Sequence, residues 1–286
     1  MKVVRSASWL QCRNPRPRPV CRVVVFPHAG GSANAYNAFA QGFPDDHEVW
    51  VVQYPGRESR LAEPLVDEMD PLVDGIAAAV ADLVAAGSVA AGGGADAAAA
   101  CDVDVPLVLF GHSMGASVAY ETARRLAEWP GLVRLLVVSA RAAPTVSRPG
   151  RVHTLAREEF VRVLRDHGGT DDAILAHEEL LDFVLSIVRN DYRLIETYRP
   201  PDQVQVPVPV PVLALAAQDD ATVRVADIRA WVDATTIRFD HRVFPGGHFY
   251  LHADPAPIID EITAGISRAL RPHGPVPLRG KQDSAG

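Results

Sequence analysis

The chain has 286 residues, 48% of them hydrophobic, so it can bury a sizeable core and fits one large domain with appendages. Its formal net charge of −7 and pI near 5.8 argue against a general nucleic-acid binder. Cys12, Cys21 and Cys101 are too few for a disulfide framework and lack zinc-site spacing, which favours a reducing cytoplasm. We also find neither a signal-peptide pattern nor a continuous apolar stretch of about 20 residues, and expect no membrane association.

The first 19 residues form a basic segment, and no acidic side chain precedes Asp45. The basic residues of this part are Lys2, Arg5, Arg13, Arg16, Arg18 and Arg22. A solvated tail is the simpler interpretation of the segment. Attraction of an acidic partner is the alternative.

From residue 20 onward, strand patterns alternate with helical patterns. The expected strands are residues 20–26, 48–53, 106–110, 135–139, 210–217 and 238–244. The expected helices are residues 34–40, 70–86, 116–127, 225–234 and 257–270. This alternation predicts one α/β domain over residues 20–271, with a mostly parallel central sheet flanked by helices and a site at the carboxyl ends of the strands.

Two low-complexity stretches interrupt or follow this pattern. Residues 87–104 are rich in alanine and glycine, and we expect a flexible surface loop there. Residues 272–286 are rich in proline, glycine and charge, and we expect a disordered tail.

A longer interruption, residues 144–201, is helical by pattern and lies between two expected core strands. Leu181, Val184, Leu185 and Val188 follow the i, i+3, i+4, i+7 spacing of one apolar helix face. Packing of this face on the sheet is the simplest interpretation, and a lid over the strand ends is the functional one. The candidates for an apolar lining under that lid are Phe160, Leu164, Phe183 and Ile187.

The stretch Gly111-His112-Ser113-Met114-Gly115 joins an expected strand to an expected helix. A serine at such a sharp turn has an exposed hydroxyl, and the flanking glycines leave room for neighbouring backbone. The pattern alone is common in ordinary turns. Assigning Ser113 as a nucleophile therefore requires a carboxylate and then a histidine later in the chain.

Both partners occur at strand ends. His248 follows two glycines after the expected strand 238–244, where a loop can place its ring over the sheet edge, and it is our candidate base. Asp219 and Asp220 follow the expected strand 210–217, and either can orient the imidazole. Simple turn residues are the alternative interpretation of the two aspartates.

An acyl-transfer site also needs donors for the negative oxygen of its tetrahedral intermediate, each worth about 3–4 kcal/mol of barrier. The glycine-containing loop that follows the first expected strand, residues 27–31, is the place to seek one. We nominate the backbone amides of Ala29 and Met114 as the oxyanion hole. A plain glycine turn is the alternative interpretation of the loop.

Four motifs occur in order along the chain: Phe26-Pro27-His28-Ala29-Gly30-Gly31-Ser32, Gln53-Tyr54-Pro55-Gly56-Arg57-Glu58, Gly111-His112-Ser113-Met114-Gly115-Ala116 and Gly246-Gly247-His248-Phe249. Together they resemble the type II thioesterases, free-standing editing enzymes of modular polyketide and non-ribosomal peptide synthases. The resemblance runs from about Trp9 to about Leu270 and implies an α/β-hydrolase fold with an inserted helical lid.

The resemblance also bears on the choice of acid. The family's acid lies in a Gly-x-x-Asp-Pro-x-Val-like context, which corresponds here to residues 217–223 and favours Asp220 over Asp219. This chain departs from the pattern, because Ala217 and Ala221 stand where the family has glycine and proline. Asp219 therefore remains a competitor.

For function, the resemblance implies that Ser113 attacks an aberrant or short acyl thioester on the phosphopantetheine arm of a carrier protein. The resulting acyl-serine would be hydrolysed with His248 as base and acid. Acyl or peptidyl carrier protein domains are the expected partners, with no cofactor or metal of the enzyme's own. We expect a cytoplasmic monomer.

Three alternatives to this function stay open. A general carboxylesterase or lipase would use the same triad on free esters, and a product-releasing thioesterase would differ only in its acceptor. From another class, a non-catalytic ligand-binding protein can occupy the same fold.

Overall fold

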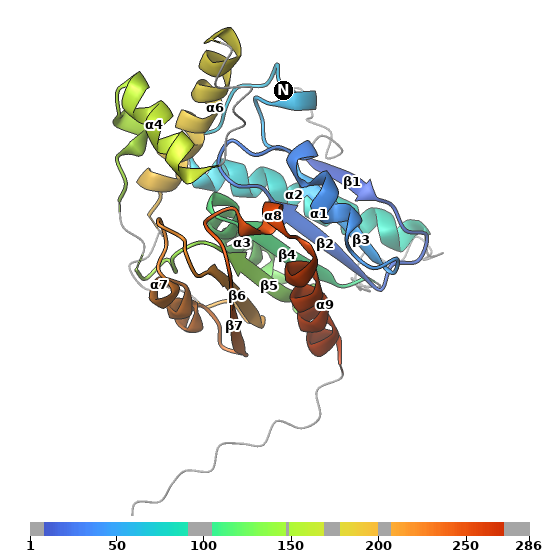
Figure 1. Cartoon of the computed structure of the whole chain (residues 1–286). Coiled ribbons are helices and arrows are strands. Elements are labelled where there is room, and N and C mark those ends of the chain that lie inside the picture. The colour runs from blue at the N-terminus through green and yellow to red at the C-terminus, as the bar shows by residue number, and fades with distance from the viewer. Residues whose placement is uncertain (1–8, 91–104, 147–148, 169–177, 200–206, 272–286) are drawn as a thin grey trace, which may run out of the picture.

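The computed structural model describes residues 9–90, 105–146, 149–168, 178–199 and 207–271. Within them a seven-stranded sheet forms the centre, in the order β1-β3-β2-β4-β5-β6-β7 (Figure 1). Its strands are β1 (Leu10–Asn14), β2 (Cys21–Phe26), β3 (His47–Val52), β4 (Leu107–His112), β5 (Val133–Ser139), β6 (Val212–Ala217) and β7 (Phe239–Phe244). Strands β2 to β7 are parallel and β1 pairs antiparallel with β3, so the expected mostly parallel sheet is present.

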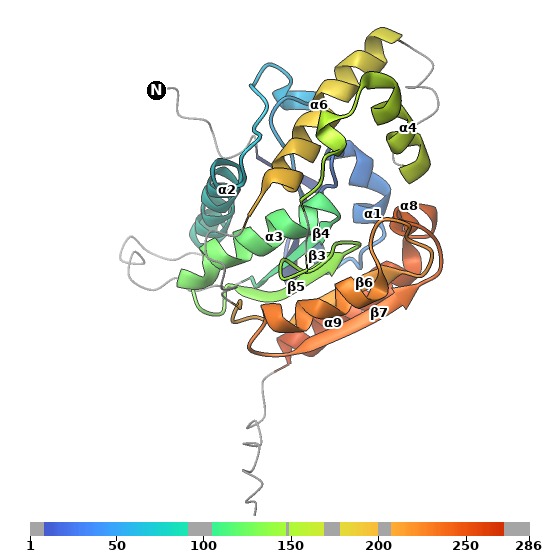
Figure 2. The same ribbon diagram turned by 90° about the vertical axis from the view of Figure 1, so that its left-hand side faces the viewer.

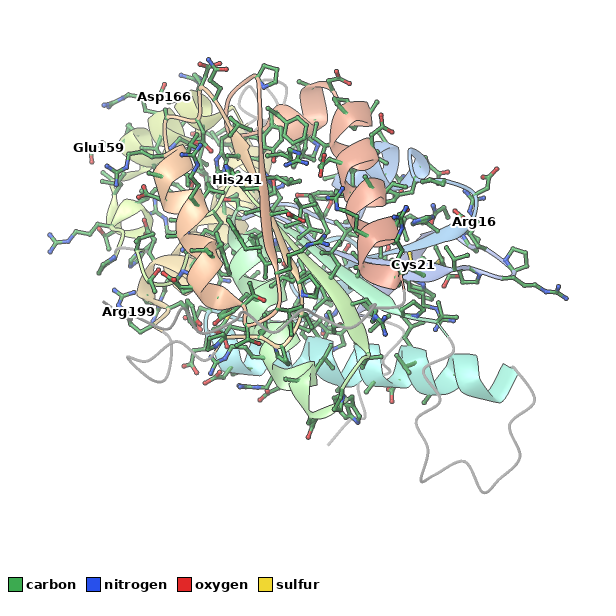
Figure 3. All side chains as sticks on the ribbon, turned by 90° about the horizontal axis from the view of Figure 1, so that it is seen from below. Arg16, Cys21, Glu159, Asp166, Arg199 and His241 are labelled. Carbon is green, nitrogen blue, oxygen red and sulfur yellow. The ribbon has the colours of Figure 1, made fainter. Side chains whose placement is uncertain are left out.

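Helices cover both faces of this sheet. They are α1 (Asn37–Gln41), α2 (Met69–Ala90), α3 (Met114–Arg125), α7 (Val225–Arg229), α8 (Tyr250–Ala253) and α9 (Ala256–Leu270). Along β2, Val24 and Phe26 point into the core shared with α2 and α3, whereas Val23 and Val25 point into the core shared with α1 and α9. Figure 3 shows α2 (cyan) and α9 (pale red) on opposite sides of the sheet. Burial of both faces explains why the inner strands β2, β4, β5 and β6 have nearly continuous apolar sequences.

The N-terminal basic segment differs from the expectation. Strand β1 belongs to the sheet, and Arg13, Arg16 and Arg22 form ion pairs with acidic residues of the chain, at N···O distances of 3.9, 3.0 and 2.9 Å. The acidic partners are Glu58, Asp45 and Glu48. From residue 9 onward the segment is therefore part of the fold, and these three arginines are paired with acids from later in the chain; Lys2 and Arg5 lie outside the described residues.

The first residues of the expected surface loop, 87–90, are helical. Helix α2 continues to Ala90, since alanine has the highest helix propensity and extends the helix beyond residue 86. Residues 91–104 of the expected loop, and the expected tail 272–286, lie outside the described residues.

The chain segment between β5 and β6 forms the helical subdomain that we call the lid. It contains α4 (Arg157–His167) and α6 (Glu178–Thr197), with a short 3-10 helix at Val152–Thr154 before them. Figures 1 and 2 show α4 and α6 together at one end of the molecule, outside the sheet. None of the helices in the described residues has the length and hydropathy of a membrane span.

Candidate active site

Ser113 occupies the turn between β4 and α3, in a conformation that side chains rarely adopt. Its φ of 54° and ψ of −119° are strained for a residue with a Cβ atom. A Cβ on Gly111 would lie 2.2 Å from the Gly115 carbonyl oxygen, and a Cβ on Gly115 would lie 2.0 Å from the Phe26 carbonyl oxygen. Both positions therefore require glycine, and the tight turn pushes the serine hydroxyl outward.

Ser113, His248 and Asp220 meet although they come from three separate turns. His248 Nε2 lies 2.9 Å from Ser113 Oγ, and His248 Nδ1 lies 2.7 Å from Asp220 Oδ2. The three residues follow β4, β7 and β6, whose carboxyl ends lie on one edge of the sheet. The arrangement has the geometry of a nucleophile, a base and an orienting acid.

Asp220 rather than Asp219 contacts the imidazole. The Asp220 side chain is 1% exposed, and its Oδ1 accepts from the Thr222 amide and hydroxyl at 2.8 and 2.7 Å and from the Val223 amide at 3.1 Å. Asp219 is exposed, and its amide donates to the Gly246 carbonyl at 3.0 Å. Sequence reasoning missed Thr222, whose position two residues after an aspartate is the signal of an Asx turn.

The environment of Asp220 favours its ionised form. Burial alone would raise the pKa of this carboxyl, but the hydrogen bond and charge of His248 and the donors of Thr222 outweigh burial and lower it. A carboxylate here accepts the His248 Nδ1–H, which leaves Nε2 free to accept the proton of Ser113. The Thr222 hydroxyl, 3.0 Å from Nδ1, gives the ring a second polar neighbour.

Two further histidines flank the site and are kept neutral. His112 Nδ1 lies 2.9 Å from Ser139 Oγ, and burial, followed by the nearby histidines, holds the pKa of His112 well below its usual value. His28 Nδ1 lies 2.9 Å from the Tyr36 hydroxyl, and burial, with smaller effects of His252, His248 and Arg57, lowers the pKa of His28 to about 3. Each of these rings is therefore held in place by the hydroxyl of a neighbouring side chain.

The proposed oxyanion donors lie beside Ser113. Ala29 and Met114 line the same cavity as the serine, and Met114 is the first residue of α3, where amides have no partner inside the helix. The loop that carries Ala29 is fixed at its start, because the Tyr54 hydroxyl donates to the Pro27 carbonyl at 3.1 Å and the Gly31 amide donates to the His28 carbonyl at 2.9 Å.

Comparison with known proteins identifies the family. The thioesterase domain model matches residues 21–93 and 96–266. The chain belongs to the thioesterase family. As a member of this family it is a thioester hydrolase, and the type II thioesterase resemblance expected from the motifs is confirmed.

Individual relatives agree with this assignment. The chain is 36% identical over 273 residues to a probable cadicidin biosynthesis thioesterase of Streptomyces griseus, covering 95% of this chain and 68% of that protein. It is 35% identical over 263 residues to thioesterase PikA5 of Streptomyces venezuelae, covering 91% and 86%. The structure of the type II thioesterase BorB from the borrelidin biosynthetic cluster superposes with a TM-score of 0.73 at 34% identity, covering 92% and 98%. The expected α/β-hydrolase fold is thereby confirmed.

The thioesterase site opens into a cavity of about 190 Å³ beside Ser113. The sheet side contributes Ala140 and Arg141 from the end of β5. The lid contributes Gly150, His167, Tyr192, Ile195 and Glu196. Burial lowers the pKa of Arg141 to about 10, with Glu196 and Tyr198 acting in the opposite direction. In the described part of the chain, no group of His, Cys, Asp or Glu side chains is placed to hold a metal ion.

The four expected lining residues of the lid do not line this cavity. Phe160 and Leu164 of α4 pack into a separate small core with the apolar face of α6, and Ile187 is buried as well. Phe183 is 43% exposed. The apolar periodicity of α6 serves packing within the lid, and the helix reaches the cavity further along, through Tyr192 and Ile195.

Proposed function

We propose that this thioesterase hydrolyses short or aberrant acyl chains from the phosphopantetheine arm of acyl or peptidyl carrier protein domains. The contact that carries the proposal is the continuous relay from Ser113 Oγ through the His248 ring to Asp220, with links of 2.9 and 2.7 Å. A relay of this kind activates an otherwise weak hydroxyl nucleophile. It needs no group besides the chain's own residues and water.

The mechanism follows from which atoms face one another. Ser113 Oγ attacks the thioester carbonyl carbon while His248 Nε2 takes the hydroxyl proton, and Asp220 stabilises the imidazolium that forms. The amides of Ala29 and Met114 stabilise the oxyanion. Collapse of the tetrahedral intermediate breaks the C–S bond, and the imidazolium protonates the leaving thiolate. Water, deprotonated by the same His248, then hydrolyses the acyl-serine ester and releases the free acid.

Cavity size supports a short acyl chain. At about 190 Å³ it lies below the roughly 300–1,000 Å³ typical of pockets that enclose drug-sized ligands. Its wall combines apolar Ile195 with polar His167, Glu196 and Arg141, so it is not the uniformly apolar tunnel that a long fatty chain requires. The relatives belong to cadicidin biosynthesis and to the borrelidin biosynthetic cluster, and these contexts support carrier-bound acyl groups as the substrate class.

The decisive experiment is mass spectrometry of acyl carrier proteins incubated with the enzyme. We expect loss of the acetyl or propionyl mass from the carrier with wild type and no loss with Ser113→Ala, a fall in rate of about 10⁵-fold or more. The same pair should differ in labelling by a fluorophosphonate probe. Faster turnover of a free p-nitrophenyl ester than of the acylated carrier would instead identify a general esterase.

A further inference from the structure

A buried ion pair that the relay does not use joins the lid helix α6 to the segment after β3. Arg57 and Asp191 form two parallel contacts, Nη1 to Oδ2 at 2.7 Å and Nη2 to Oδ1 at 2.8 Å. Their side chains are only 5% and 4% exposed. Arg57 belongs to the Gln53-Tyr54-Pro55-Gly56-Arg57 motif, which sequence reasoning used for recognition but gave no role, and Asp191 lies on α6 of the lid.

The same two side chains also hold the loop that carries Ala29. Asp191 Oδ2 accepts the Gly30 amide at 2.8 Å, and Arg57 Nη1 donates to the Gly31 carbonyl at 3.1 Å. Thus one backbone donor and one backbone acceptor, directly after the proposed oxyanion donor Ala29, are fixed by residues from elsewhere in the chain. A small shift of this loop would misplace the Ala29 amide relative to the reacting carbonyl.

Close packing brings α6 near enough for these contacts. Gly30 has a φ of 78°, and a Cβ at this position would lie 2.7 Å from Val188 Cγ2 of α6. Val188 and Asp191 are three residues apart and therefore lie on the same face of the helix. Glycine at position 30 is needed both for the backbone conformation and for the approach of the lid helix.

Electrostatics explains why Asp191, which accepts the hydrogen bond of the Gly30 amide, is paired with an arginine. A carboxylate makes a strong hydrogen bond to the Gly30 amide. Left uncompensated in a buried position, however, its negative charge would oppose the negative oxygen that develops in the transition state. The Arg57 guanidinium compensates that charge, so the loop is held by a pair with no net charge.

We propose that Asp191 and Arg57 are positioning residues for the oxyanion hole, through which the docked lid helix α6 sets the geometry of the Ala29 amide. This inference rests on the proposed function insofar as Ala29 is an oxyanion donor. It assigns the lid a part in the chemical step in addition to covering the substrate.

Two double variants test the proposal because both remove the ion pair and differ only in the acceptor for the Gly30 amide. Arg57→Met with Asp191→Asn keeps a side-chain oxygen at that place, and Arg57→Met with Asp191→Leu puts an apolar group of similar size there. With a propionyl thioester of N-acetylcysteamine, we expect the Leu variant to lose about 100-fold in kcat with little change in KM, since the loop is misplaced. The Asn variant should retain a kcat at least about tenfold above the Leu variant.

A second readout isolates the oxyanion hole. An acyl trifluoromethyl ketone forms a tetrahedral adduct with the serine, and the oxyanion of this adduct occupies the oxyanion hole. The affinity of the Leu variant for the ketone should therefore fall by a factor similar to its loss in kcat. Arg193→Ala is the matched control, because Arg193 joins the same helix to Asp67 through an exposed ion pair at 3.3 Å and has no role in the proposal. Its kcat should remain within about twofold of wild type.

Equal kcat values for the two double variants, with both folded by circular dichroism and thermal melting, would overturn the positioning role. If the Leu variant does not fold, the single Asp191→Asn variant decides, and a loss in kcat above about tenfold with unchanged ketone affinity would contradict the proposal. Failure of wild type on acylated carrier, together with intact ketone binding, would reject only the proposed substrate.

Discussion

The cavity has one wall made by the sheet edge and another made by the lid, and the two are held in place differently. Ser113 and Asp220 sit on short turns after parallel strands, and backbone hydrogen bonds such as Ser113 N to Ser139 O, at 2.8 Å, fix these turns. The lid wall consists mainly of side chains on α6, together with Gly150 and with His167 of α4, and the position of α6 depends on a small apolar core shared with α4. Changes in the first wall should abolish chemistry, whereas changes in the second should alter substrate choice.

The Arg57–Asp191 pair lies where this division is incomplete. Its two residues come one from the sheet side and one from the lid, and together they hold the loop of Ala29. We therefore expect the lid to affect kcat through this contact.

The largest effect in the sheet-edge wall is expected from a substitution of the acid, Asp220. Asp220→Asn should lower kcat by about 10⁴-fold, because an amide at this position favours the wrong imidazole tautomer. Asp219→Asn is the matched control, one residue away and exposed, and should stay within about twofold of wild type. Steady-state kinetics on a soluble acyl thioester measure both. A larger loss for Asp219→Asn would move the acid to that residue.

The choice of Asp220 over Asp219 as the acid depended on the family pattern, and the structure shows the physical reason for it. Two adjacent aspartates after a strand look alike in sequence, and only the turn decides which one faces the neighbouring strand end. Here Asp220 turns inward because Thr222 and Val223 donate to it. The carboxyl-edge placement of Ser113, in contrast, follows from the apolar pattern of β4, whose residues are all buried, and that of His248 follows from the two glycines after the edge strand β7.

A second prediction concerns His28, a buried histidine beside the sheet edge, and its effect on stability at low pH. The pKa of His28 is lowered to about 3, whereas in the unfolded chain a histidine binds its proton near pH 6.5. Below about pH 6.5 the unfolded state therefore binds more protons than the native state, and the free energy of unfolding falls by about 1.4 kcal/mol per pH unit for such a residue. The loss continues until the pH reaches the native pKa.

Urea unfolding at pH 7 and pH 5 measures this effect. His28→Gln should reduce the loss of unfolding free energy between pH 7 and pH 5 by about 2 kcal/mol relative to wild type, because the loss begins near pH 6.5, whatever the effect of the substitution on stability at pH 7. An identical slope for wild type and His28→Gln would show that His28 binds its proton equally well in the native and unfolded states, which contradicts the lowered pKa.

Two parts of the fold were less accessible from sequence, for different reasons. Strand β1 has only five residues, with polar Gln11, Arg13 and Asn14 among them, so it lacks the apolar pattern of a core strand. The lid patterns correctly indicated amphipathic helices. Periodicity, however, shows that a helix has an apolar face without showing what covers it, and in α6 that face meets α4.

The smallest expected effect tests the lid wall. Ile195 lines the cavity, so Ile195→Ala should enlarge it and raise the ratio of kcat/KM for hexanoyl over propionyl thioesters by about tenfold, in line with the limited discrimination that a few methylene groups provide. Phe183→Ala changes an exposed residue of the same helix that does not line the cavity, and it should leave the ratio unchanged. Labelling of Ser113 by a fluorophosphonate probe should be equal in both variants. A shift in the ratio with Phe183→Ala alone would mean that the substrate reaches the outer face of α6, and the assignment of the lid wall would have to change.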